Sequence, residues 1–259
     1  MILCFSASGN SRLVAELLAR ETGDELLSLN ELFKQGEPWR LHSDRPYVVV
    51  SPIYAWRLPK KVEDFLARGE FSGCRQMYVI TTMGGDDGAA GKYCRKIVES
   101  RGMTLLGYQG IAMPDNYMVS FKVPDRATAI EEIRKSLPLI QQTGERIKRG
   151  DKLPQKKGKP QDGFLSSVVN WGFRNYMANS KSFHVSQACI QCGKCVTGCP
   201  SNNITLREGK ILFGKDCMFC LACLNNCPVH AIDYKDAGKK HGYYTCPPIQ
   251  EVLPEKKEK

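Results

Sequence analysis

Eight of the chain's 12 cysteines lie between residues 189 and 227. They form two copies of the pattern C-x2-C-x2-C-x3-C-P, which read CIQCGKCVTGCP and CMFCLACLNNCP, and Cys217 repeats Cys189 at an offset of 28 residues. The start of the chain, MILCFSASGN, has neither the basic nor the long apolar region of an export signal. We therefore expect a reducing, cytoplasmic compartment, where clustered cysteines bind metal rather than form disulfides.

The spacing in both copies is that of the bacterial ferredoxin run, and residues 184–235 resemble a two-cluster bacterial ferredoxin domain. In such a run three cysteines hold one [4Fe–4S] cluster and the fourth, before proline, completes the other. The resemblance implies one cluster on Cys189, Cys192, Cys195 and Cys227, and a second on Cys217, Cys220, Cys223 and Cys199. A zinc ribbon uses paired C-x2-C hooks and has no use for the third cysteine or the Cys-Pro step.

A second chemical feature is the turn FSASGNSR, residues 5–12, between an apolar run and a helical pattern. Backbone amides and hydroxyls at the start of a helix form an anion site. The turn matches neither G-x-x-x-x-G-K-[ST] nor G-x-G-x-x-G. Its pattern Ser6-x-Ser8-Gly9-x-Ser11 resembles the T-x-T-G-x-T phosphate loop of flavodoxins, with serine in place of each threonine. An ordinary helix cap is the alternative, because hydroxyl-rich turns also serve that purpose.

The flavodoxin resemblance implies an FMN site built by four loops. The phosphate is expected on Ser6, Ser8, Gly9, Asn10 and Ser11. Trp56 and Tyr54 are the candidates to stack on the isoalloxazine, although aromatic residues after a buried strand are also common in cores. The ring edge is expected along Thr82, Met83, Gly84 and Gly85, and a third wall at Asn116 and Tyr117. Cys74 and Cys246 are expected to have no role.

The elements that must position these residues alternate over the first 150 residues. Apolar runs predict strands at residues 2–6, 25–29, 45–54, 76–85 and 104–114. Amphipathic stretches predict helices at residues 10–22, 59–69, 88–102 and 125–150, the last bent or interrupted at Pro138. This alternation predicts an α/β fold with a doubly wound parallel sheet, and the flavodoxin-like order 2-1-3-4-5 places FMN at its switch point. A small α+β two-cluster ferredoxin domain follows.

We divide the chain into four parts. Residues 1–150 are predicted to form a flavodoxin-like FMN-binding domain and residues 184–246 the ferredoxin domain. Residues 151–183 are predicted to be a linker, rich in Pro, Gly and Lys, followed by a connector helix. Apolar residues at helical spacing over 164–177 predict that this helix packs on a neighbouring domain. Residues 247–259 are predicted to be a charged tail.

The formal net charge of +10 raises the question of a nucleic-acid partner. Residues 1–150 contribute +3 and residues 151–259 contribute +7. Two clusters with their thiolates add about −2 each and a bound phosphate about −1.5 to −2, which cancels more than half of the excess. No apolar run approaches the roughly 20 residues that span a bilayer. We therefore predict neither a nucleic-acid partner nor membrane insertion.

The whole chain resembles the flavodoxin–ferredoxin fusion proteins of anaerobes. The resemblance implies an electron-transfer protein that passes electrons between two [4Fe–4S] clusters and FMN, serving a redox partner protein or a small-molecule acceptor. The alternative is an FMN-dependent reductase of a small organic substrate or quinone, with Asp86, Asp87, Asp115 or Tyr117 as proton donor. Whether the chain is an enzyme therefore stays open. A zinc-dependent nucleic-acid binder is a third, less favoured class, and predicts a colourless protein whose binding weakens with salt.

Overall fold

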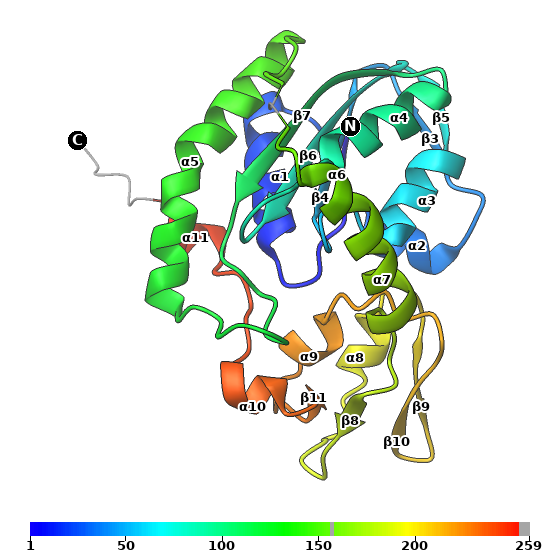
Figure 1. Cartoon of the computed structure of the whole chain (residues 1–259), viewed down its shortest axis with the longest axis vertical. Coiled ribbons are helices and arrows are strands. Elements are labelled where there is room, and N and C mark those ends of the chain that lie inside the picture. Colours follow the sequence, from blue (N-terminus) through cyan, green and yellow to red (C-terminus); the bar gives the residue numbers. More distant parts are fainter. Residues whose placement is uncertain (156–157, 254–259) are drawn as a thin grey trace.

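The computed structural model describes residues 1–155 and 158–253. Its largest sheet has five parallel strands in the order β2-β1-β4-β6-β7 (Figure 1). The strands are β1 (Ile2–Cys4), β2 (Leu26–Ser28), β4 (Tyr47–Pro52), β6 (Gln76–Met83) and β7 (Thr104–Ala112). Counted within this sheet alone, the order is 2-1-3-4-5, so the predicted flavodoxin-like doubly wound sheet is confirmed.

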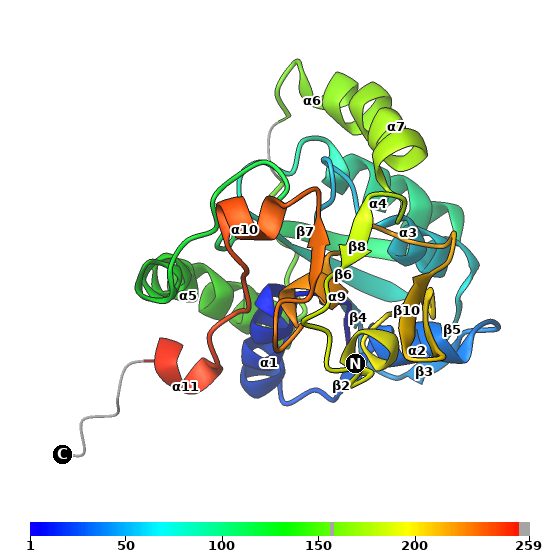
Figure 2. The same ribbon diagram turned by 90° about the horizontal axis from the view of Figure 1, so that it is seen from below.

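Helices cover both faces of the sheet, which is why β4 and β6 are buried along nearly their whole length. One layer contains α1 (Asn10–Thr22) and α5 (Arg126–Arg149), and the other contains α3 (Lys60–Arg68) and α4 (Ala90–Ser100). Figure 2 shows the sheet between the two layers. Each face has its own apolar core, with Ile2 packed on one side and Leu3 on the other, because successive strand residues point to opposite faces.

The helix α5 was predicted to be bent or interrupted at Pro138, and the interruption is wrong. The helix is continuous from Arg126 to Arg149 with Pro138 inside it. Proline removes one backbone donor and leaves the carbonyl four residues earlier unpaired. Both Pro138 and Arg134 are exposed, so water can satisfy that carbonyl.

Three short elements of the N-terminal domain were not predicted from the sequence. The helix α2 (Leu29–Gln35) begins directly after β2, where the Ser28 side chain accepts a hydrogen bond from the Glu31 amide. The strands β3 (Arg40–Ser43) and β5 (Glu70–Gly73) form a separate parallel pair. Each has only four residues, which is too short to show a recognisable period.

The connector predicted from its apolar spacing is a continuous helical run between the linker and the C-terminal domain (Figure 1). It consists of α6 (Asp162–Phe164), η1 (Leu165–Val169), α7 (Asn170–Gly172) and η2 (Phe173–Met177). The segments η1 and η2 have π-helical hydrogen bonding. Such wider turns are rare and occur frequently at functional sites.

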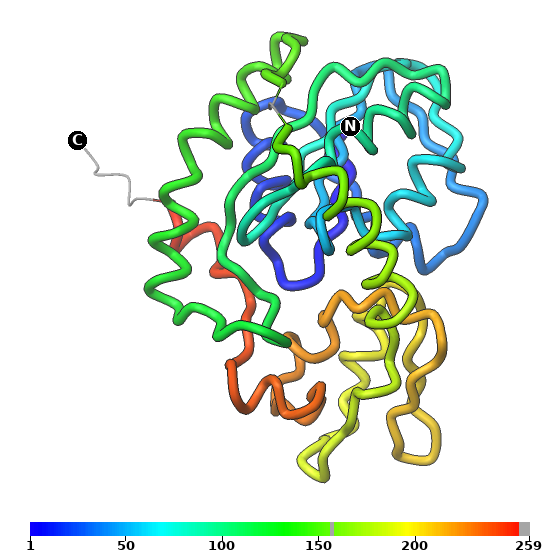
Figure 3. The backbone as a smooth tube through the Cα atoms, in the orientation of Figure 1, coloured from blue at the N-terminus to red at the C-terminus, as the bar shows by residue number. Residues whose placement is uncertain are grey.

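The C-terminal domain is built from two small antiparallel sheets and two helical turns. Its elements are β8 (Phe183–Val185) paired with β11 (Ile232–Tyr234), β9 (Ile204–Arg207) paired with β10 (Lys210–Phe213), α8 (Lys194–Thr197) and α9 (Ala222–Asn225). The helix α10 (Ala237–His241) follows, and the chain then returns to the N-terminal domain (Figure 3). There α11 (Ile249–Val252) packs on α5, with Val252 buried. Residues 254–259 of the predicted charged tail lie outside the described residues.

The two domains meet through an apolar core. Met118 and Val123 from the loop before α5 pack with Phe219, Leu221 and Leu224 of the second cysteine run. A shared apolar core resists sliding and opening more than a polar interface does. The interface therefore holds the two domains in one relative position. Among the described helices, none combines the length and apolar character needed to cross a membrane.

Candidate functional site

The two cysteine runs have the same backbone conformation. Left-handed φ values recur at corresponding non-glycine residues, namely Gln191 and Phe219, Asn202 and His230, and Glu208 and Asp236. Gly193 and Leu221 are both left-handed and begin α8 and α9. Left-handed residues between right-handed ones curl the chain and turn successive amides toward a common point. The sequence repeat is therefore also a structural repeat.

Each predicted set of four cysteines lines a cavity of its own. One cavity is lined by Cys189, Cys192, Cys195 and Cys227, and the other by Cys199, Cys217, Cys220 and Cys223. The fourth cysteine of each run thus lies with the first three of the other run. Apolar side chains such as Ile232 in the first cavity and Phe183 in the second complete the linings and limit the access of water.

Backbone amides point at several of these sulfur atoms. The Asn203 and Ala231 amides donate to the Sγ atoms of Cys199 and Cys227 at 3.4 and 3.3 Å, and the Phe219 amide donates to Cys217 Sγ at 3.4 Å. Such donors stabilise a thiolate. No three His, Cys, Asp or Glu side chains in residues 1–155 and 158–253 meet as closely as a single metal ion requires. The curled loops, the amide donors and the two four-cysteine cavities fit iron–sulfur clusters.

A cavity of about 810 Å³ opens at the carboxyl ends of the strands of the large sheet. Every residue predicted to contact FMN, apart from Gly9, lines it: Ser6, Ser8, Asn10, Ser11, Tyr54, Trp56, Thr82, Met83, Gly84, Gly85, Asn116 and Tyr117. The cavity lies beyond β1 and β4, where the strand order reverses and doubly wound folds bind their ligands. Its volume is within the range of about 300–1,000 Å³ that is usual for cofactor sites.

The first turn of α1 provides the anion-binding part of this cavity. The amides of Asn10, Ser11 and Arg12 have no acceptor among the described residues. Free amides at a helix N-terminus carry a partial positive charge. They fit a phosphate group without any lysine.

The serine hydroxyls of this turn also make hydrogen bonds within the protein. The Ser6 hydroxyl accepts from the Gly9 amide at 3.2 Å, and the Ser8 hydroxyl accepts from the Asn116 side chain. The Ser11 hydroxyl is 2.7 Å from that of Thr82. The Ser6 and Ser8 hydroxyls brace the loop as acceptors and keep their own protons, so these hydroxyls and the free amides can both bind an anion.

The C-terminal domain also holds the Ser6–Ser11 loop. The Tyr244 hydroxyl donates to Asn10 Oδ1 at 2.6 Å, and the Cys246 amide donates to the Ser8 carbonyl at 2.8 Å. Gly9 has a φ of 109°, and a Cβ at this position would lie 2.6 Å from Cys246 Cβ. Gly9 therefore permits the contact with the C-terminal segment. Cys246, for which no role was expected, contributes through its backbone.

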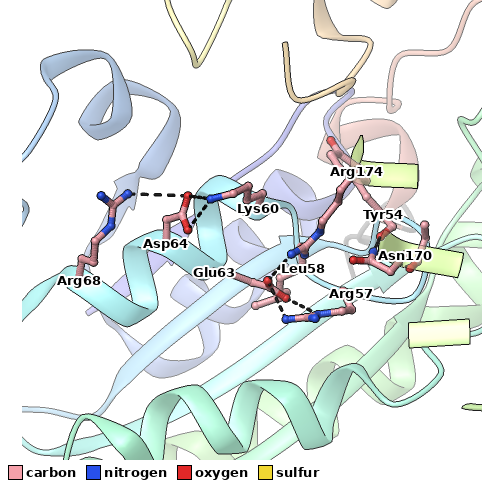
Figure 4. Close-up of polar contacts among 10 residues, drawn as sticks. Tyr54, Arg57, Leu58, Lys60, Glu63, Asp64, Arg68, Asn170 and Arg174 are labelled. Carbon is pink, nitrogen blue, oxygen red and sulfur yellow. Dashed lines mark hydrogen bonds and ion pairs between the residues drawn. The ribbon is translucent and has the colours of Figure 1, made fainter. Parts of the chain in front are cut away.

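The two aromatic candidates lie in a tight turn after β4. The Tyr54 amide donates to the Arg57 carbonyl at 2.8 Å, and Ala55 and Trp56 are both left-handed. The connector binds the carbonyls of this turn, because Asn170 Nδ2 donates to Tyr54 at 3.1 Å and to Ala55 at 2.8 Å (Figure 4). The connector thereby fixes the residues that face the cavity.

A buried carboxylate on α3 holds the connector against this helix. Glu63 is 7% exposed and receives two hydrogen bonds from Arg57, at 2.7 and 2.9 Å, and one from Arg174 at 2.7 Å (Figure 4). Arg174 also donates to the Leu58 carbonyl at 2.8 Å. One carboxylate on α3 therefore links the aromatic turn and the connector.

Part of the cavity wall was not predicted from the sequence. The connector contributes Val169, Gly172, Phe173 and Met177, and the second cysteine run contributes Phe219, Cys220 and Leu221. The apolar spacing of the connector predicted that it packs on a neighbouring domain. The sequence contains no signal that this packing surface is the mouth of a cavity, because that depends on how the two domains meet.

The chain is similar to one family and to several known proteins. A family described as a 4Fe-4S dicluster domain matches residues 181–228. A ferredoxin of Methanothermococcus thermolithotrophicus is 35% identical over 48 residues, which are 18% of this chain and 80% of the ferredoxin. The solution structure of two-electron reduced Megasphaera elsdenii flavodoxin is 14% identical at a TM-score of 0.36, covering 57% of this chain and 99% of the flavodoxin. The Trp repressor binding protein of Bacillus subtilis gives 12% identity and a TM-score of 0.31, covering 61% of this chain and 100% of that chain.

Proposed function

The chain belongs to the ferredoxins with a 4Fe-4S dicluster domain, which it joins to a flavodoxin-like domain, and we propose that it transfers electrons between two [4Fe–4S] clusters and one FMN. The flavodoxin-like assignment rests on the strand order of the large sheet. When bound, the clusters exchange single electrons and the flavin holds one or two. The external partner that we propose is a redox protein or a small-molecule acceptor.

One observation carries this proposal. Cys220 lines both the large cavity and the cavity of the second cysteine set. A side chain that contacts both cavities leaves no room for a separating layer of protein. The flavin site and one cluster site therefore share a wall.

The residues around the shared wall hold the two sites at a fixed separation. The amides of the first turn of α1 bind the phosphate, and Tyr54 and Trp56 flank the cavity on the side of the connector. Phe173 and Phe219 limit the access of water where the domains meet. Because both domains are in one chain and share an apolar core, transfer between their cofactors does not depend on the protein concentration.

Cofactor analysis of the anaerobically purified protein tests the assignment. We expect about eight iron and eight sulfide ions and one FMN per chain, with the visible spectra of both cofactor types. Iron and sulfide without flavin would refute the FMN site, and the Ser6–Ser11 turn would then be only a helix cap. Zinc without sulfide would refute the clusters.

A reductase of a small organic substrate or quinone is the second candidate. The observation that supports this candidate is that the large cavity extends past the proposed flavin loops to Ser120, Phe121 and Met177. Of the proton donors considered for it, Asp86, Asp115 and Tyr117 line the cavity, whereas Asp87 is buried beside Gly110. Turnover of a quinone with dithionite as donor and no partner protein would favour this candidate. Reduction only of an added redox protein would favour the electron carrier.

A further inference from the structure

The connector turns its large apolar side chains outward. Five of them lie along its exposed side and are between 42% and 70% exposed: Phe164, Val168, Trp171, Tyr176 and Met177. A helix of a globular protein normally turns its apolar stripe toward the core. We call these five side chains the connector ridge.

Polar side chains of the same helical run face inward and hold it in place. Ser166 is buried, and its hydroxyl donates to the Trp56 carbonyl and accepts from the Ala89 amide, both at 2.9 Å. Asn170 and Arg174 make the hydrogen bonds described above. Turning the helix to bury the ridge would break all these bonds. The fold therefore fixes the ridge on the outside.

The ridge is continuous and reaches the rim of the large cavity. The rings of Trp171 and Tyr176 pack edge to face, with their centroids 5.6 Å apart. Met177 lines the cavity, and so does Phe121, which is also exposed. Single exposed apolar side chains are ordinary, whereas a run of them marks an interaction site. The connector lies at the periphery of the molecule, where such a site is accessible (Figure 2).

The shape and composition of the ridge fit a lipid surface better than a protein partner. A stable protein interface has about 20–30 residues on each side and a polar rim. The ridge is a single row of side chains on one helical run. Helices with Phe and Trp on one face bind at the boundary between lipid headgroups and acyl chains, where Trp and Tyr are enriched.

The charges beside the ridge fit anionic headgroups. Residues 152–160, KLPQKKGKP, carry four lysines and no acidic residue, and residues 163–207 contain no Asp or Glu. Asp162 lies between these ranges, but it is buried and accepts from the Lys159 amide at 2.8 Å. Asp86 pairs with the Lys159 side chain. Basic segments beside an apolar helix face are attracted to anionic lipids.

We propose that the connector ridge docks this protein on the surface of a membrane that contains anionic lipids. The helix lies in the headgroup region with the ridge toward the acyl chains, and no part of it spans the bilayer. Docking in this way brings the cavity rim at Met177 and Phe121 to the lipid surface. The inference goes beyond the proposed electron transfer and does not depend on it.

Cosedimentation of the full-length, anaerobically purified protein with lipid vesicles tests the inference. We expect the wild type to bind vesicles of phosphatidylcholine and phosphatidylglycerol in equal amounts, and to bind phosphatidylcholine vesicles more weakly. Trp171→Ser and Phe164→Ser should each weaken binding to the anionic vesicles about tenfold. Leu139→Ser is the matched control, because Leu139 is an exposed apolar residue on α5, in the other helix layer. It should bind as the wild type does.

Three results would overturn the proposal. The first is a wild type that binds neither kind of vesicle, or both equally. The second is a Trp171→Ser variant that binds as strongly as the wild type. The third is self-association of the wild type that Trp171→Ser abolishes, because the ridge would then bind a second copy of the chain. Iron, sulfide and flavin counts show whether each variant is folded. Wild-type protein that binds vesicles but holds no flavin would refute only the proposed function.

Discussion

At the scale of single residues, Gly9 allows the two domains to come into contact because it has no side chain. Its φ of 109° is strained for any other residue, and its backbone touches Cys246. Gly9→Ala combines the strain with a steric clash, so we expect an unfolding free energy lower by about 2–4 kcal/mol and FMN affinity lower by more than about tenfold. Denaturation and flavin fluorescence measure the two effects.

Gly23→Ala is the matched control for this prediction. Gly23 is also left-handed, with a φ of 66°, but no atom lies within 4 Å of its added Cβ. The unfolding free energy of this variant should fall by only about 1 kcal/mol, because alanine is less stable in the left-handed conformation, and its FMN affinity should not change. Equal losses in both variants would show that the contact with Cys246 has no effect.

Asn170 supports the wall of the proposed FMN cavity without lining the cavity. Its side chain donates to two carbonyls of the aromatic turn. Each bond contributes about 0.5–1.5 kcal/mol, so Asn170→Ala should loosen Tyr54 and Trp56 and weaken FMN binding about tenfold. Flavin fluorescence titration measures the affinity. Asn175→Ala, which removes only a bond to Trp171 within the exposed part of the connector, should bind FMN as the wild type does.

At the scale of elements, the connector depends on α3 through Glu63. Removing one partner of a buried ion pair costs about 3–5 kcal/mol, and Glu63→Ala leaves both Arg57 and Arg174 without their carboxylate. The arginine side chains are 19% and 20% exposed, so we expect a smaller loss of stability, about 2–3 kcal/mol. Chemical denaturation measures it.

Asp64 provides the comparison on the same helix. It pairs with Lys60 and Arg68, whose side chains are 66% and 54% exposed (Figure 4). Such surface pairs contribute about 0–1 kcal/mol, so Asp64→Ala should change the stability by less than about 1 kcal/mol. A loss as large as that of Glu63→Ala would contradict the anchoring role of the buried carboxylate.

The elements differ in how far the sequence could predict them. The five strands of the sheet and the helices that cover it were predicted, because apolar periodicity reports which face of an element is buried. The connector was predicted as a helix, but its packing face was not: Ser166 and Asn170 are buried there, whereas most of its apolar side chains, including Trp171, are exposed. The strands β3 and β5 were missed because four residues show no period. The role of the Ser6–Ser11 loop in binding phosphate stays a prediction. The bracing of this loop by Tyr244 and Cys246 was not predicted, since nothing in the sequence indicates that a distant segment returns to it.

At the scale of the whole molecule, hydrogen bonds connect the C-terminal domain to the loop of the proposed flavin site. Asn226, which lies between two predicted ligands, donates to the Ala7 carbonyl at 3.1 Å, and Tyr244 donates to Asn10. Small metal-bound domains lose their structure without the metal. Iron removal by a chelator should therefore weaken FMN binding about tenfold or more, measured by flavin fluorescence. Unchanged affinity in the iron-free protein would contradict this coupling.

The shared wall at Cys220 is the central claim, and the kinetics of electron transfer within the chain test it most directly. A rapid, substoichiometric pulse of reductant is given to the clusters, and flavin absorbance is followed at several protein concentrations. If the two sites adjoin in one chain, flavin reduction is first order with a rate constant independent of the protein concentration. A rate proportional to the protein concentration, or a flavin that stays oxidised despite a favourable potential, would contradict the account.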